Sequence, residues 1–285
     1  MKSEQTIPVN GVDLYAVSQG EGPTVVLMGG PWFGHYYLRP LADEVAREFQ
    51  VVSYDARGSG RSSALTADQI TLDGHLRDLE GVRRGLGIDR MSLIGHSLGA
   101  LVTLLYAAEH PGNVAALILA HAGPPFDPEL QGRLHEAFVK GYTSQDKERL
   151  EAIEASPGFR DRDAQTHEEY FKALYVPFFW DRSVLERLDF GFTPTTALYA
   201  LEAEEQLVHQ LHGRDPVEKL GQITSPTLVM HAEHDIIPEA FSQFLAKRIG
   251  GAKFARLSDV GHFSYLENPA LVGETMVKFL ERHGG

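Results

Sequence analysis

The segment GHSLG, residues 95–99, contains the strongest candidate for a reactive group in this sequence. It has the spacing G-x-S-x-G and lies between an apolar run typical of a buried strand, residues 91–96, and one typical of a buried helix, residues 98–109. A tight strand-to-helix turn of this kind strains the serine backbone and leaves little room for side chains two positions away. We therefore predict that Ser97 is a nucleophile, exposed at the carboxyl edge of a sheet.

A serine hydroxyl reacts only when a positioned base takes its proton, and that base is in turn oriented by an acid. His262 is the candidate base, because it lies between an expected short strand and the last helix. Asp235 is the candidate acid, because it follows the strand expected from residue 226 and gives the order serine, acid, histidine. Asp127 is an alternative acid, and helix capping is an alternative role for Asp235.

Acyl transfer also requires backbone amides that stabilise a developing oxyanion. The amide of Leu98 is one candidate, because this residue directly follows the serine. The amide of Gly30 is the other, because Gly29 and Gly30 end an expected strand, residues 24–28, and allow close approach of the backbone. A simple turn before the next helix is the alternative interpretation of these glycines.

The surrounding elements indicate how these residues are positioned. Short β-branched runs alternate with amphipathic stretches before residue 123 and again after residue 222, which is typical of parallel βαβ units. The intervening segment, residues 123–222, is polar, aromatic and helical in pattern, without a clear strand. We predict a core formed by residues 1–122 and 223–285, with residues 123–222 inserted as a helical cap.

Composition narrows the function further. The chain has 285 residues, a formal net charge of −13 and no cysteine, which disfavours nucleic-acid binding and excludes thiolate chemistry. Its start lacks an apolar signal-peptide core and no run of about 18 apolar residues occurs, so we expect a cytoplasmic protein without a membrane partner. His231 and His234 do not form a helical metal-binding pattern, and residues 55–62 lack a nucleotide-binding signature, so no metal or cofactor is expected.

Four motifs together resemble the α/β-hydrolase superfamily over nearly the whole chain. They are the nucleophile motif GHSLG, the acid loop HDIIP, the histidine loop GHFSYLENP and the loop DARGSGRS. The resemblance implies an α/β-hydrolase fold: a mostly parallel sheet flanked by helices, with a helical cap after the sixth strand. It also implies hydrolysis of a small molecule or short peptide without a cofactor.

Within that superfamily, GGPWFG followed by SYDARGSGRS is most similar to proline iminopeptidases, in which cap glutamates bind the amine of the substrate. Glu202 ends a segment, ALYALE, with spacing similar to one glutamate motif of those enzymes, and Glu204 and Glu205 lie beside it. A solvated acidic helix face is the alternative interpretation. The expected substrate contacts are Trp32, Glu202, Phe179 and Trp180.

Aromatic residues are dense in the cap, and we expect them to roof an apolar pocket that favours uncharged acyl groups. The expected roof consists of Tyr170, Phe171, Tyr175, Phe178, Phe179 and Trp180. Three functions remain open at this stage. They are hydrolysis of a small or medium uncharged ester or amide, aminopeptidase activity of the proline iminopeptidase type, and ligand binding without catalysis.

Overall fold

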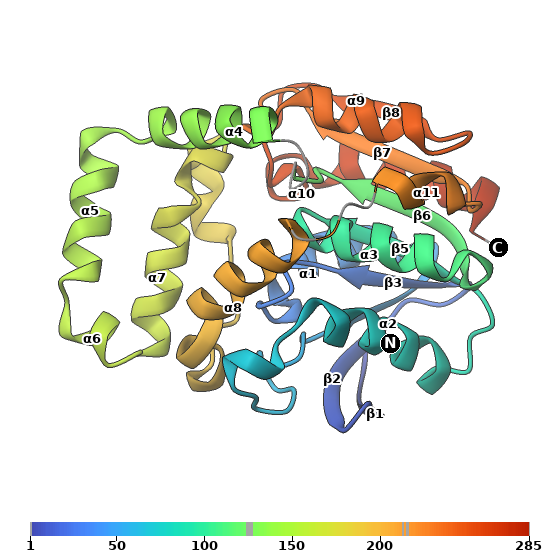
Figure 1. The fold of residues 1–285 in the computed structure, drawn as a ribbon, viewed down its shortest axis with the longest axis horizontal. Helices are drawn as coiled ribbons and strands as arrows, with labels where there is room; N and C mark the ends of the chain where they lie inside the picture. The colour runs from blue at the N-terminus through green and yellow to red at the C-terminus, as the bar shows by residue number, and fades with distance from the viewer. Residues whose placement is uncertain (1, 124–127, 213, 215–216, 285) are drawn as a thin grey trace.

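The computed structural model describes residues 2–123, 128–212, 214 and 217–284. Eight strands of this described part form one sheet, in the order β1-β2-β4-β3-β5-β6-β7-β8 (Figure 1). The strands are β1 Ser3–Val9, β2 Val12–Gln19, β3 Thr24–Met28, β4 Gln50–Tyr54, β5 Met91–His96, β6 Val114–Ala120, β7 Thr227–Ala232 and β8 Lys253–Leu257.

All neighbouring strands from β4 to β8 in the sheet order pair in parallel. At the other edge, β2 pairs antiparallel with both β1 and β4. Every residue of β5 and of β7 is buried, as expected for central parallel strands that are covered on both faces. The carboxyl ends of β3 and β5 are adjacent, with Met28 opposite Gly95. This register brings the turns that follow the two strands together at one edge of the sheet.

Helices cover both faces of the sheet. On one face, α1 (Arg39–Val45) packs against α11 (Pro269–His283), while α2 (Leu72–Gly85) and α3 (Leu98–Glu109) pack together on the other (Figure 1). Nearly every residue of α3 is buried, because this helix lies directly against β5 and β6. The predicted mostly parallel sheet flanked by helices is confirmed.

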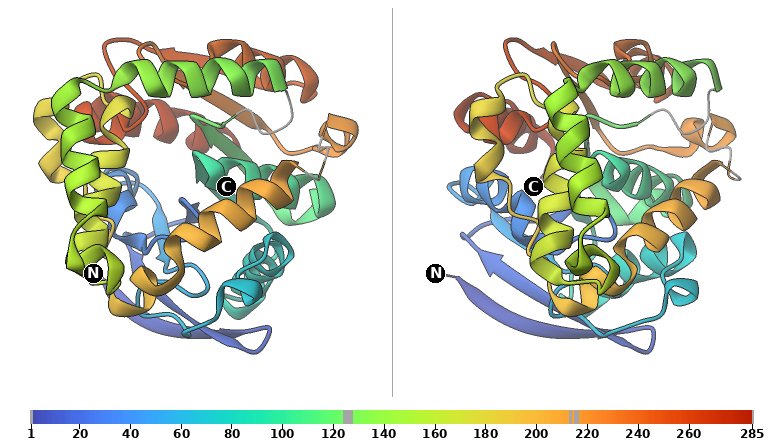
Figure 2. Two further views of the ribbon diagram at one scale, coloured as in Figure 1. Left: turned by 60° about the vertical axis from the view of Figure 1, so that its left-hand side comes forward. Right: turned by 90° about the vertical axis from the view of Figure 1, so that its left-hand side faces the viewer.

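A helical insertion follows β6, as predicted. Its α-helices are α4 Pro128–Gly141, α5 Ser144–Glu154, α6 Pro157–Arg160, α7 Ala164–Leu174 and α8 Pro194–His212. In Figures 1 and 2 these helices extend beyond the sheet at one side, and α8 returns across the molecule toward β7. Within the described residues, no helix is long and apolar enough to cross a bilayer.

After the insertion, β7 leads into α9 (Glu239–Arg248), and β8 leads into the short helix α10 (Ser264–Glu267) and then α11. The loops after β7 and β8 carry Asp235 and His262 respectively. Because β7 and β8 are parallel neighbours, the two loops leave the sheet at the same edge. The loop after β5 leaves at this edge as well, so the fold brings all three predicted reactive residues to one side.

Candidate active site

Ser97 lies in a sharp turn between β5 and α3. Its backbone angles, φ 58° and ψ −126°, fall in a region that residues other than glycine rarely adopt. A side chain at position 95 would overlap Thr103, and one at position 99 would overlap the carbonyl oxygen of Gly29. The two glycines of the motif are therefore required by close packing around the turn, which supports the strained conformation of Ser97.

His262 and Asp235 form a buried pair. Nδ1 of His262 lies 3.0 Å from Oδ2 and 3.2 Å from Oδ1 of Asp235. The carboxylate also accepts a hydrogen bond of 3.0 Å from the amide of Ile237. Since a carboxylate can only accept, Nδ1 carries the shared proton and Nε2 is left as the basic nitrogen of the ring.

Two further histidines, for which the sequence pattern predicts no role, lie beside this pair. His96 Nε2 lies 3.1 Å from the carbonyl oxygen of His262, and His121 Nδ1 lies 3.6 Å from Asp235 Oδ2. Burial is the main cause that holds the pKa of both rings well below the usual value, and a charge on His262 would lower it further. His96 and His121 therefore stay neutral and add no positive charge that would oppose protonation of His262.

The two predicted oxyanion residues, Gly30 and Leu98, both line the cavity that contains Ser97. Leu98 is the first residue of α3, so its amide belongs to the unpaired group at a helix N-terminus. The amide of Gly30 instead donates a hydrogen bond to the hydroxyl of Tyr37. This contact could not be inferred from motif spacing, because Tyr37 lies on the following helical turn, the 3-10 helix η1 (His35–Leu38).

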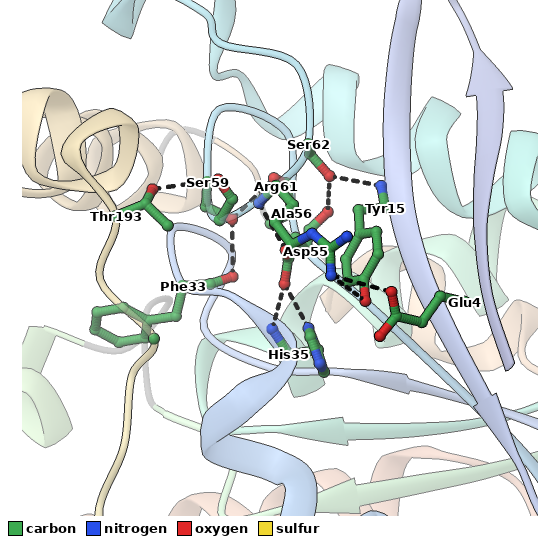
Figure 3. A network of polar contacts seen from close by, with 12 residues as sticks. Glu4, Tyr15, Phe33, His35, Asp55, Ala56, Ser59, Arg61, Ser62 and Thr193 are labelled. Carbon is green, nitrogen blue, oxygen red and sulfur yellow. Dashed lines mark hydrogen bonds and ion pairs between the residues drawn. The ribbon is translucent and has the colours of Figure 1, made fainter. Parts of the chain in front are cut away.

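The loop after β4 supports the turn that carries Gly30 (Figure 3). The buried carboxylate of Asp55 accepts bonds of 2.7 Å from both the amide and Nδ1 of His35, and one of 2.8 Å from the amide of Arg61. Ser59 Oγ donates to the carbonyl of Phe33 at 3.0 Å. These bonds fix both the loop of residues 55–62 and the segment that follows Gly30, so the polar groups of this loop serve an internal structural role.

The same loop connects to the insertion. The amide of Gly60 donates to Thr196 Oγ1 at 2.8 Å, and Thr193 Oγ1 donates to the carbonyl of Gly60 at 3.2 Å. Ser62 Oγ accepts a bond of 3.0 Å from the amide of Tyr15 on β2 (Figure 3). One short loop thus joins the edge hairpin, the Gly30 turn and the start of α8.

Ser97 and His262 line a cavity of about 220 Å³ between the sheet edge and the insertion. Seven aromatic rings contribute to its wall, those of Trp32, Phe33, Tyr37, Tyr175, Phe178, Phe190 and Phe263. Glu204 is the one carboxyl group that the described residues contribute to this wall. Desolvation raises its pKa to about 7, although Tyr175 Oη donates a hydrogen bond to it at 3.2 Å.

A family model described as the alpha/beta hydrolase fold matches residues 23–269. The chain belongs to the α/β-hydrolase family. Its predicted resemblance to this superfamily, and to proline iminopeptidases within it, is confirmed. A proline iminopeptidase of Lactobacillus crispatus is 24% identical over 98% of each chain.

Solved structures similar to this α/β hydrolase have other activities in their names. The enol-lactonase of Burkholderia xenovorans is 23% identical with a TM-score of 0.67, and the alignment covers 97% of this chain and 100% of the lactonase. A thermophilic esterase of Thermogutta terrifontis is 20% identical with a TM-score of 0.74, covering 99% and 100% of the two chains. At these identities the likeness establishes the fold.

Of the four expected substrate contacts, only Trp32 lines the cavity of this α/β hydrolase. Glu202 instead forms an ion pair with Arg162 on the outer side of α8. Residues three or four apart share a helix face, and Glu202 and Glu205 line a separate surface pocket, whereas Glu204 lines the cavity that contains Ser97. The glutamate that faces the serine is therefore Glu204.

The other expected contacts in the cap pack onto the core of the hydrolase. Phe179 is buried and stacks on Phe263, with ring centroids 4.7 Å apart. Trp180 is 55% exposed and stacks on His234 at 3.5 Å. Of the expected aromatic roof, only Tyr175 and Phe178 belong to the cavity wall, and the alternative acid Asp127 lies outside the described residues.

The segment around Phe178 is also attached to the histidine loop of the hydrolase. The carbonyl of Phe178 accepts a bond of 2.9 Å from the amide of His262. Glu267 accepts bonds from the amides of Gly261, Trp180 and Asp181 at 2.5, 2.9 and 3.2 Å. The insertion therefore bonds the amide of the candidate base directly and, through Glu267, is linked to the amide of Gly261 before it.

Proposed function

We propose that this protein is a serine hydrolase that cleaves a small or medium uncharged ester or amide through an acyl-enzyme intermediate. The observation that carries the proposal is the buried His262–Asp235 pair, 3.0 Å apart, in the wall of the cavity that also holds the strained Ser97. Strained nucleophiles and oriented imidazoles are costly to maintain, and they occur together where the pair activates a hydroxyl.

In the proposed first step, Ser97 Oγ attacks the substrate carbonyl carbon while its proton passes to Nε2 of His262. Asp235 stabilises the resulting imidazolium and keeps it oriented. Negative charge collects on the carbonyl oxygen, and the Leu98 amide, with a second donor at the Gly30 turn, stabilises it. Collapse of the tetrahedral intermediate expels the alcohol or amine, which receives its proton from His262.

In the second step, water attacks the acyl-enzyme and gives its proton to His262. The acid leaves when Ser97 Oγ regains that proton. The aromatic wall favours an uncharged acyl group, because a charged group would lose hydration there without a compensating partner. We further propose that residues 123–222 act as a cap over a catalytic core made of residues 1–122 and 223–285.

Labelling with a fluorophosphonate probe tests the nucleophile directly. We expect the wild-type protein to be labelled and Ser97→Ala to remain unlabelled, and we expect wild type alone to hydrolyse short p-nitrophenyl esters. Ser225→Ala is a matched control, because Ser225 is buried, its hydroxyl has no partner among the described residues and it does not line the cavity. Equal labelling of wild type and Ser97→Ala would contradict the proposal, and a wild type without labelling or turnover would support a ligand-binding protein instead.

Aminopeptidase activity is a second candidate, and Glu204 is the observation that favours it. Its carboxyl group lies in the same cavity as Ser97 and forms no ion pair within the described part of the chain, whereas Glu202 is already paired with Arg162. A substrate with a free α-ammonium group would supply the missing positive charge and favour ionisation of Glu204. Relatives of this chain include proteins named proline iminopeptidase.

Prolyl and alanyl p-nitroanilides, compared with acyl p-nitrophenyl esters, separate the two candidates. For an aminopeptidase we expect Glu204→Gln to reduce nitroanilide turnover strongly, and Glu202→Gln to have a small effect because Glu202 lies outside the cavity. Ester turnover without any nitroanilide turnover in the wild type would reject the aminopeptidase and leave the esterase. Equal effects of the two glutamine variants would reject the role of Glu204.

A further inference from the structure

The hydroxyl of Tyr37 is hydrogen-bonded to the amide of the predicted oxyanion donor Gly30, and both residues line the cavity. Tyr37 is 4% exposed, lines the same cavity as Ser97 and Leu98, and its Oη accepts the hydrogen bond of the Gly30 amide. The Gly30 amide is therefore already paired with a phenol oxygen in the absence of substrate.

The proton of this hydroxyl is free to be donated. A tyrosine hydroxyl is both a donor and an acceptor, and here the Gly30 amide occupies the acceptor side. Among the described residues, no group accepts the Tyr37 proton. Burial also raises the pKa of the phenol well above its usual value, so the phenol stays protonated over the pH range in which the protein is folded.

We propose that the hydroxyl of Tyr37 is a catalytic oxyanion donor in the reaction, and that the Gly30 amide acts behind it. This inference rests on the proposed serine hydrolase function. As Ser97 Oγ bonds to the carbonyl carbon, the carbonyl oxygen gains charge and accepts hydrogen bonds from Tyr37 Oη and the Leu98 amide. The phenol O–H bond stays intact throughout. The hydrogen bond from the Gly30 amide to the phenol oxygen polarises the O–H bond of Tyr37. The phenol therefore donates a stronger hydrogen bond to the substrate oxygen.

Two other roles for Tyr37 give different outcomes. A plug would cover the Gly30 amide and move away when substrate binds, so removing its hydroxyl would expose the amide and raise the rate. A packing residue would act through its ring, which contacts Phe33 and His96 at centroid distances of 5.7 and 5.9 Å. Phenylalanine at position 37 keeps those ring contacts and removes only the hydroxyl.

Tyr265 offers a matched control. It is fully buried, its ring centroid lies 6.4 Å from that of Tyr37, and its hydroxyl has no partner among the described residues. It does not line the cavity. Tyr265→Phe therefore removes a buried phenol hydroxyl from the same neighbourhood without touching the proposed oxyanion site.

The experiment compares wild type, Tyr37→Phe, Tyr265→Phe and Ser97→Ala on a short p-nitrophenyl ester. We expect Tyr37→Phe to lower kcat by about 10²–10³-fold, as loss of one oxyanion donor does, with KM nearly unchanged. Affinity for a trifluoromethyl ketone, which forms an oxyanion adduct, should fall in parallel, while affinity for the acid product should hold. Tyr265→Phe should retain wild-type values.

A wild type without Ser97-dependent turnover would reject the proposed function itself. With an active wild type, an unchanged or higher kcat in Tyr37→Phe would overturn the role of Tyr37, and so would an equal loss in Tyr265→Phe. If Tyr37→Phe does not fold, 3-fluorotyrosine is placed at position 37 instead. This residue retains the aromatic ring and carries a more acidic hydroxyl. A change in ketone affinity without a change in product affinity then supports the donor, and no change in either rejects it.

Discussion

Oε2 of Glu267 lies 2.5 Å from the backbone nitrogen of Gly261, the residue that precedes His262. Its other oxygen accepts the amides of Trp180 and Asp181 from the insertion. A carboxylate with three amide donors is a firm anchor, since each donor would otherwise be left without a partner. Glu267 thus joins the loop of the candidate base to the cap through a single side chain.

Glu267→Gln should shift the histidine loop, because an amide group cannot accept at its nitrogen and leaves at least one of the three donors unpaired. We expect a loss of about 1–3 kcal/mol of unfolding free energy and a lower kcat with little change in KM. Urea unfolding and ester kinetics measure both. Glu281→Gln, at an exposed position of α11, controls for the lost charge. Wild-type kinetics in Glu267→Gln would show that the anchor does not position His262.

Asp235→Asn should disturb the orientation and tautomer of His262, because the asparagine amide group can donate to Nδ1 and leave Nε2 protonated. We expect kcat to fall by roughly 10²–10⁴-fold, the range associated with loss of general base catalysis. Steady-state ester hydrolysis measures the effect. Asp259→Asn serves as the control, since Asp259 is exposed and has a left-handed φ of 56° that asparagine tolerates. Comparable losses in the two variants would argue against the role of Asp235.

Glu204 predicts a pH-dependent stability. Its pKa in the folded protein, about 7, is above the ordinary glutamate value of 4.5, so the folded state binds the proton more tightly than the unfolded state does. Stability therefore falls as pH rises from about 4.5 to about 7. Glu204→Gln removes this dependence and should be more stable than wild type at pH 8, by on the order of 1–3 kcal/mol.

Urea unfolding at pH 4 and pH 8 tests this expectation for Glu204. Glu205→Gln, at an exposed position of the same helix, removes one charge without removing the half-buried carboxyl of Glu204. A pH profile of Glu204→Gln that parallels wild type would mean that the Glu204 carboxyl remains well hydrated in the folded protein.

Ser97→Gly should stabilise the fold while abolishing turnover. The φ of 58° at Ser97 penalises any side chain but not glycine. We expect Ser97→Gly to exceed Ser97→Ala in unfolding free energy by about 1–2 kcal/mol, even though glycine is the more flexible residue in the unfolded state. Denaturant unfolding of the two inactive variants measures the difference. Equal stability would mean that the turn relaxes in the absence of the serine.

The placement of the three candidate reactive residues at one edge of the sheet was the most predictable part of this structure. Ser97, Asp235 and His262 each follow a strand that is clear in the sequence, and parallel strands end at one edge. The edge hairpin of β1 and β2 was missed, although Asn10-Gly11 between alternating apolar residues is a strong hairpin signal. Its turn adopts the positive φ values, 45° and 80°, that this dipeptide favours.

Residues that act through packing were not predictable in the same way. Tyr37, His96 and His121 reach the site through contacts between distant segments, and no motif spacing encodes them. The choice of Glu202 over Glu204 depended on which face of α8 meets the core. Both faces of that helix carry acidic residues, so its hydrophobic pattern could not decide the orientation.

The bonds of Phe178, Trp180 and Asp181 to the histidine loop have a consequence for protein engineering. A chimera that takes its whole insertion from a relative would also exchange the groups that pair with the amide of His262 and with the carboxylate of Glu267. Such a chimera would change the substrate cavity and the contacts of the candidate base His262 at the same time. Grafts that replace the helices on either side but retain residues 178–181 would change the cavity roof and leave the proton-transfer machinery as it is.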